Sequence, residues 1–162
     1  MSPITAGGWS GGAYIGTSTR DGRSTVRFFS KDFSPGRPVW TEPKGQGGLN
    51  GAIANEYPRV DLMGEFVAWT RMKGPGDLRV IAMKPTYAPP DQPPAVIGDK
   101  DFQSVYFCDW TEQGTMLGNA STDGKNWMLV IYDRDGTLLR RLATPAPPAK
   151  GAIASWRKYG HR

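Results

Sequence analysis

The sequence predicts an all-β protein of the β-propeller type, with about three four-stranded antiparallel blades. A strand–turn–strand pattern recurs along the chain, and Tyr14, Phe66 and Met116 hold equivalent places in it, 52 and then 50 residues apart. The tetrapeptide at residues 51–54 recurs identically at 151–154, two such periods later. The 21 glycines and 14 prolines interrupt every window in which an amphipathic helix could form. These three observations together indicate a repeated unit made only of strands.

Each repeat contains a predicted β-hairpin. The hairpins are expected over residues 13–29, 65–83 and 115–132. Asp21-Gly22 and Asp123-Gly124 supply the turns of the first and third, because Asp-Gly between two β-rich runs is a strong hairpin signal. In the second hairpin, the turn is a Gly-Pro-Gly sequence at 74–76.

Two further strands complete each repeat. Short outer strands are expected at 37–40, 95–97 and 138–142, and lead strands at 57–62 and 105–110. The first hairpin has no lead strand upstream, because residues 6–9 are rich in glycine. Residues 152–160 look like the missing lead strand, so we expect the C-terminal strand to complete the N-terminal blade.

The chain is therefore predicted to be a single domain of three blades over residues 1–162. The blades are expected at 8–45 plus 151–160, at 51–98 and at 102–145. The alternative is a β-sandwich of short strands. The regular repeat period favours the propeller.

The third repeat, residues 105–142, carries a series of motifs in a fixed order. They are Asp109-Trp110 with a turn ending at Gly114, the strand Met116-Leu117, Ser121-Thr122-Asp123-Gly124, the strand Leu129 to Asp133, and the turn Asp135-Gly136. This series resembles the blades of the TolB-like propeller family, also found in the propeller domains of prolyl oligopeptidase-type peptidases. The resemblance implies a fold and carries no catalytic residues, because the chemistry of such proteins usually lies in another domain or is absent.

Three blades are too few to close a ring easily, because propellers typically have about 4–8. The exposed flank of such a partial ring is expected to be apolar. Two chains related by a twofold axis would make a six-bladed ring, and we expect this homodimer. A partner protein that supplies the missing blades is the alternative.

The positive charge is concentrated at the C-terminal end. The chain has 20 basic and 15 acidic residues, and residues 136–162 contain six of the basic and none of the acidic ones. The remaining residues, 1–135, therefore have 14 basic and 15 acidic residues and a net charge of −1. The candidate partner-binding or anion-binding residues are Arg157, Lys158, Tyr159, His161 and Arg162. They could meet nucleic acid or an acidic partner, or form a solvated terminal segment.

No catalytic constellation stands out in the sequence. Residues 8–12 match the Gly-x-Ser-x-Gly pattern of a nucleophile elbow, but no helix is expected after them, and His161 is the only candidate base. We interpret this stretch as a linker. Carboxylates that could act in pairs are Asp99, Asp101, Asp109 and Glu112, and solvated loop acids explain them equally well.

Metal and cofactor motifs are also missing. Residues 133–136 resemble the start of a calcium loop without its later ligands, so we expect a turn. One cysteine and one histidine exclude an internal disulfide and the usual zinc sites. Cys108 is expected to be a buried thiol.

The six tryptophans are expected to pack between blades: Trp9, Trp40, Trp69, Trp110, Trp127 and Trp156.

Repeat architecture without catalytic residues predicts a non-enzymatic binding or assembly module that needs no cofactor. It would interact with proteins or form part of a larger complex such as a virion. Two alternatives are an enzyme of propeller fold acting on acidic polysaccharides, and nucleic-acid binding through the basic C-terminal segment. No signal peptide or membrane span is visible, so we expect a cytoplasmic or virion-associated protein rather than a secreted one.

Overall fold

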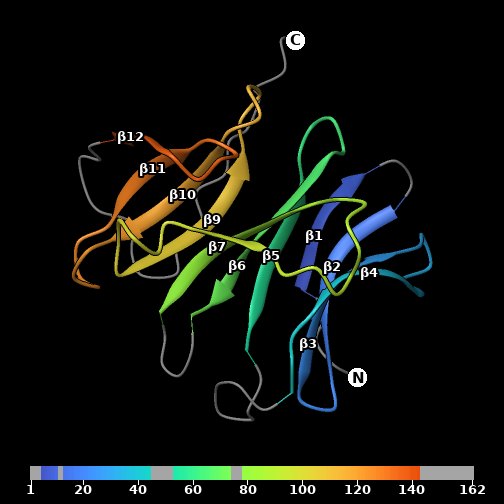
Figure 1. Ribbon diagram of the computed structural model, residues 1–162. Helices are drawn as coiled ribbons and strands as arrows, with labels where there is room; N and C mark the ends of the chain where they lie inside the picture. Colours follow the sequence, from blue (N-terminus) through green and yellow to red (C-terminus); the bar gives the residue numbers. More distant parts are fainter. Residues whose placement is uncertain (1–4, 11–12, 45–52, 74–77, 143–162) are drawn as a thin grey trace.

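The computed structural model describes residues 5–10, 13–44, 53–73 and 78–142, and it shows their backbone as strands, turns and loops without a helix. Within these ranges, twelve strands form three separate antiparallel sheets of four strands each, which Figure 1 shows side by side. None of the described residues belongs to a helix long and apolar enough to span a membrane. The predicted all-β class is confirmed, and so is the repeated four-stranded meander.

In each sheet the strands follow one another in sequence order. Sheet one consists of β1 (Thr5–Ser10), β2 (Ala13–Arg20), β3 (Arg23–Phe29) and β4 (Pro35–Thr41). Sheet two consists of β5 (Asn55–Val60), β6 (Phe66–Met72), β7 (Arg79–Pro85) and β8 (Ala95–Ile97). Sheet three consists of β9 (Ser104–Trp110), β10 (Met116–Ser121), β11 (Met128–Tyr132) and β12 (Leu138–Leu142).

The first blade differs from the prediction. Its lead strand is β1, which pairs with β2 from Thr5 opposite Thr17 to Ser10 opposite Ala13. The position beside β2, which the C-terminal strand was expected to fill, is held by β1. The register of β1 shifts between Ala6 and Trp9, where two glycines stand. Glycine in a strand often marks such a bulge rather than the absence of a strand. Residues 151–160 themselves lie outside the described residues.

The sheets stack in chain order, with sheet two in the middle. Strand β5 contacts β1, β2 and β3 of sheet one, and β9 contacts β5, β6 and β7 of sheet two. The first strand of each later sheet therefore lies against the face of the sheet before it. This arrangement fits propeller-like blades, and it differs from the two-sheet sandwich that was the alternative.

Alternation along β6 fills both interfaces of the central sheet. Val67 and Trp69 pack towards sheet one, and Ala68 between them packs towards sheet three. The cluster between sheets one and two consists of Ile15, Val26, Val39, Trp40, Val67, Trp69 and Ala82. Because both faces of sheet two are covered, its two central strands contain continuous apolar runs, at residues 66–69 of β6 and 80–83 of β7.

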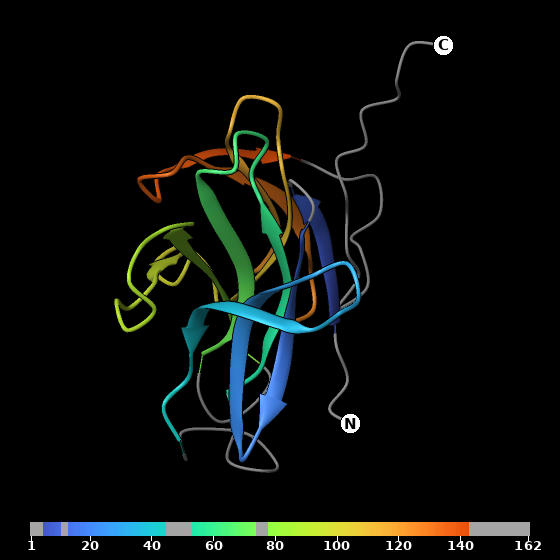
Figure 2. The same ribbon diagram turned by 90° about the vertical axis from the view of Figure 1, so that its right-hand side faces the viewer.

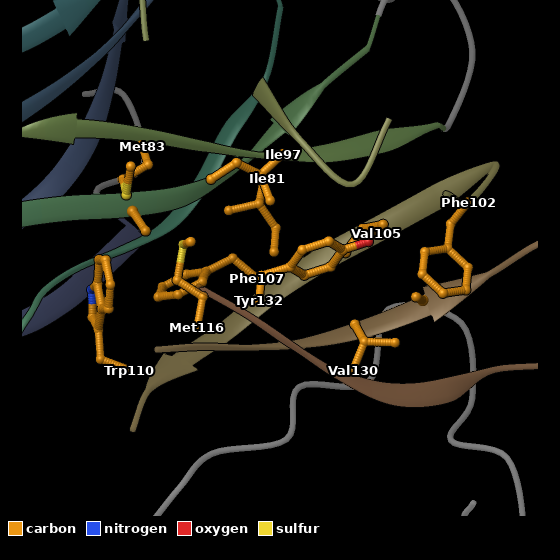
Figure 3. Packing of buried hydrophobic residues seen from close by; sticks show 12 residues of the cluster. Ile81, Met83, Ile97, Phe102, Val105, Phe107, Trp110, Met116, Val130 and Tyr132 are labelled. Carbon is orange, nitrogen blue, oxygen red and sulfur yellow. The ribbon is translucent and has the colours of Figure 1, made fainter. Parts of the chain in front are cut away.

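The larger cluster lies between sheets two and three, and Figure 3 shows it from close by. Phe107 and Trp110 meet edge to face there, with ring centroids 6.0 Å apart. Trp40, Trp69 and Trp110 are buried in the clusters between sheets, which confirms their predicted packing role. Trp127 is also buried, but it packs edge to face on Tyr106 of β9 in its own sheet. The side chains of Trp9 and Trp156 lie outside the described part of the chain.

Polar contacts also join neighbouring sheets. The Arg71 guanidinium on β6 donates from Nε and Nη2 to the two oxygens of Glu42, at 2.6 and 2.9 Å. Glu42 follows β4 and its side chain has no exposed surface. Between sheets two and three, the Thr70 hydroxyl accepts the N–H of Phe107 at 2.8 Å and donates to its carbonyl at 3.3 Å.

The two Asp-Gly hairpins form different turns. Asp21 and Gly22 have φ values of 51° and 73°, and Arg20 pairs directly with Arg23, as in a two-residue type I′ turn. The third hairpin has a longer connection, residues 122–127. The carboxylate of Asp123 accepts the N–H groups of two following residues at 2.8 Å each, and these bonds hold its pKa well below the usual range.

Candidate binding groove

A groove of about 640 Å³ opens where sheets one and two meet. Its walls come from the start of β2, from β3 and β4, from the β5–β6 turn, and from the end of β7 with the connection to β8. The lining residues are Ala13, Phe28, Arg37, Met63, Gly64, Glu65, Pro85, Thr86 and Tyr87.

Arg37 stands between two aromatic rings in this groove. Its guanidinium carbon lies 5.1 Å from the centre of the Phe28 ring and 5.2 Å from that of Tyr87. Its Nη2 donates to the carbonyl of Thr86 at 2.7 Å. Both rings attract the cation through their faces. The side chain is thus held in place, and its other N–H groups have no partner among the described residues.

Neighbouring contacts hold the walls of the groove. The N–H of Thr86 donates to the carbonyl of Glu65 at 2.8 Å, which joins the β7–β8 connection to the β5–β6 turn. The buried carboxylate of Asp61 accepts the N–H groups of Glu65 and Phe66 at 2.7 and 3.1 Å and so orders that turn. Asp61 also pairs with Arg134 of the β11–β12 turn at 3.0 Å.

Lys84 connects the two sheets beneath the groove. Only 1% of Lys84 is exposed, and its Nζ donates to the carbonyls of Val39 at 2.9 Å and Pro89 at 2.7 Å. Burial lowers the pKa of this ammonium group. Lys84 therefore acts as a structural link between β4 and the β7–β8 connection.

Exposed apolar side chains gather at the rim. Leu62 is 79% exposed, Met63 74% and Tyr87 84%. They belong to the two segments that bound the groove, and a grouped set of exposed large apolar residues typically marks an interaction site.

The predicted carboxylates are held by other partners. Asp99 and Asp101 line a second hollow of about 600 Å³ beside the β11–β12 turn. Asp99 forms an ion pair with Lys73, and Asp101 accepts a hydrogen bond from the hydroxyl of Tyr132 at 3.0 Å. Burial, followed by this hydrogen bond, raises the pKa of Tyr132. The structure thus places Asp99 and Asp101 in the wall of the same hollow.

The other two candidate acids lie elsewhere. Asp109 is on β9, with one oxygen 3.8 Å from Nε of Arg59, and burial raises the pKa of its carboxyl. Glu112 is exposed in the β9–β10 turn. Nowhere in the described ranges do three or more His, Cys, Asp or Glu side chains gather as metal ligands would.

The remaining sequence motifs have structural roles. Ser10 ends β1 opposite Ala13 of the antiparallel strand β2, which is not the strand-to-helix turn of a nucleophile elbow. The Asp133 carboxylate accepts the N–H groups of Asp135 and Thr137 at 3.0 and 2.8 Å, which confirms the predicted turn. Cys108 is a buried thiol, as predicted. The candidate residues Arg157, Lys158, Tyr159, His161 and Arg162 lie outside the described residues.

Sequence reasoning missed the groove itself. Arg37 and Tyr87 are 50 positions apart, on an outer strand and in a Pro-rich connection. The signals that could have drawn attention to them are an arginine between Gly36 and Pro38 and an aromatic residue in a connection without apolar periodicity.

No protein-family model matches the chain, and a search of curated proteins likewise finds no match.

Proposed function

We propose that the chain is a non-enzymatic, propeller-like module that binds a partner protein through the groove around Arg37. The observation that supports this is the arginine held between Phe28 and Tyr87 in a groove that exposed apolar side chains also line. Arginine and tyrosine are among the residues that supply most binding energy at protein interfaces. A positioned arginine loses little side-chain entropy when a ligand binds.

The lining favours a particular kind of segment. Phe28, Met63 and Tyr87 offer apolar surface, and the free N–H groups of Arg37 suit a carboxylate. Glu65, on the opposite wall, faces the cation of Arg134 at 3.5 Å. We therefore expect a peptide segment in which an aromatic or aliphatic side chain stands next to an acidic one.

The alternatives have less support. An enzyme acting on acidic glycans would need a free pair of carboxylates, whereas Asp99 and Asp101 are engaged by Lys73 and Tyr132. Nucleic-acid binding through residues 157–162 concerns a segment outside the described residues.

Selection of a phage-displayed peptide library on the full chain tests the groove. We expect enrichment of peptides with an acidic residue beside an apolar one. The substitution Arg37→Gln should lower the affinity of the chain for the selected peptides by about tenfold or more, because it removes a charge-assisted hydrogen bond. Arg140→Gln, on exposed β12, is the matched control and should leave their affinity unchanged. Equal affinity for the wild type and Arg37→Gln would contradict the proposal.

The six-bladed ring of two chains would bring together the outer faces of sheets one and three, and both carry arginine. The face of sheet three turned away from sheet two carries Leu129, Ile131 and Arg140, and the corresponding face of sheet one carries Arg27. Burying these cations in one interface without a counter-charge is costly. By light scattering after gel filtration we therefore expect the monomer mass of 17.7 kDa. Twice that mass would support the ring.

A further inference from the structure

The outer face of sheet one, which Figure 2 views, is polar in the part nearer the β2–β3 turn. Ile15 and Val26 face sheet two, so the alternating residues of β2 and β3 face the other way. Near the turn those residues are Gly16, Ser18 and Arg20 on β2, and Arg23, Thr25 and Arg27 on β3, whereas Tyr14 and Phe29 pair at the far end. Polar side chains therefore stand in this part of the sheet, where the sequence predicted an apolar flank.

The strand register groups these side chains. Arg20 lies opposite Arg23, Ser18 opposite Thr25, and Gly16 opposite Arg27. On β4, Thr41 lies opposite Thr25, and the two hydroxyl oxygens are 3.1 Å apart. They border a hollow of about 480 Å³, lined by Ser18, Arg20, Asp21, Arg23, Thr25, Arg27, Thr41 and Lys44.

This hollow carries an excess of positive charge. Four of its lining residues are cationic, and Asp21 is the one acidic residue among them. The carboxylate of Asp21 lies 3.6 Å from Nε of Arg20, and both side chains are more than 80% exposed, so this contact is weak. Like charges directly opposite each other on a sheet destabilise it, as Arg20 and Arg23 do here. A bound anion would relieve this repulsion.

Arg27 adds a second, independent observation. Its Nε is buried and has no hydrogen-bond partner among the described residues. Its neighbours across the sheet are Gly16 and Pro38, neither of which has a side-chain acceptor. The pairing of β3 with β4 is irregular on both sides of Arg27, a feature that redirects side chains near binding sites. A buried N–H without an acceptor costs free energy, which a ligand oxygen would recover.

We propose that this hollow binds a phosphate or sulfate group, with Arg27 as its central donor and Arg23 as a second one. A planar guanidinium matches a tetrahedral oxyanion, and the Ser18 and Thr41 hydroxyls can donate as well. The described residues that line the hollow include no aromatic side chain, so they offer no stacking platform of the kind that recognises bases of single-stranded nucleic acid. The ligand is thus defined by its anionic group.

Isothermal titration calorimetry of the full chain with inorganic pyrophosphate at low salt tests this site. We expect saturable binding that weakens by about tenfold or more in Arg27→Gln. Arg27→Lys should also weaken pyrophosphate binding, because lysine keeps the positive charge but has no N–H donor at the buried position of the arginine Nε. Arg23→Gln, at an exposed position, provides a variant with little risk to the fold.

Arg37→Gln and Arg140→Gln are the matched controls, and both should bind pyrophosphate as the wild type does. The result separates this site from the groove, because Arg27→Gln should leave peptide binding intact. The proposal is overturned if pyrophosphate produces no binding heat, or if Arg27→Gln and Arg140→Gln weaken it equally. Binding of duplex DNA without any binding of pyrophosphate would also overturn it.

Discussion

Replacing Arg71 by glutamine is expected to destabilise the protein by about 3–5 kcal/mol, because it leaves the carboxylate of Glu42 buried without its counter-charge. Glu42→Gln should lower the free energy of unfolding by a smaller amount. The side chain of Arg71 is 21% exposed, so water can still reach a guanidinium that has lost its partner. Urea unfolding followed by circular dichroism measures both free energies.

The double variant measures the interaction energy between Arg71 and Glu42 apart from the contacts that each side chain makes with other residues. If Arg71 and Glu42 interact directly, Arg71→Gln combined with Glu42→Gln should be less destabilising than the sum of the two single changes. Arg20→Gln is the control, because its contact with Asp21 is fully solvated, and its effect should stay within about 0.5 kcal/mol. Equal effects of Arg71→Gln and Arg20→Gln would contradict the contact between sheets one and two.

Truncation of Trp69 to alanine should lower the free energy of unfolding by about 3–5 kcal/mol. Trp69 has no exposed surface, packs between sheets one and two, and donates from Nε1 to the side-chain oxygen of Asn55 at 2.7 Å. Trp69→Phe keeps most of the ring but leaves that oxygen unpaired, so a loss of about 1–3 kcal/mol is expected.

The same urea experiment measures the Trp69 variants. Leu62→Ala, at a position that is 79% exposed, is the control and should change stability by less than about 0.5 kcal/mol. A Trp69→Ala protein that unfolds at the wild-type urea concentration would show that sheet one does not depend on this interface.

Local patterns identified most strands. The outer strands expected at 95–97 and 138–142 coincide with β8 and β12, and the lead strand expected at 105–110 differs from β9 by one residue. β1 was missed because two glycines were interpreted as the end of strand structure, whereas they stand at a bulge. The third hairpin has a longer loop than Asp-Gly predicts, because the Asp123 carboxylate binds the backbone beyond the turn.

The candidate sites were much less predictable. The sequence directed attention to carboxylates and to the basic C-terminal residues, because those features are visible in composition. The groove depends on the contact of Arg37 with Thr86, 49 positions away, and the hollow on sheet one depends on which face of β3 turns outward. Both features therefore depend on residues that only the packing of the strands brings together.

Local sequence patterns predicted the strand class, the repeat and which strands form each hairpin, because turn residues and period-2 alternation act over a few positions. The stacking of the sheets, and the residues that meet between them, depend instead on contacts between distant parts of the chain. Glu42 and Arg71, 29 positions apart, become partners through the packing of sheet one on sheet two. That packing also leaves the basic side of sheet one facing outward, since burial of Ile15 and Val26 turns Arg27 to the opposite face.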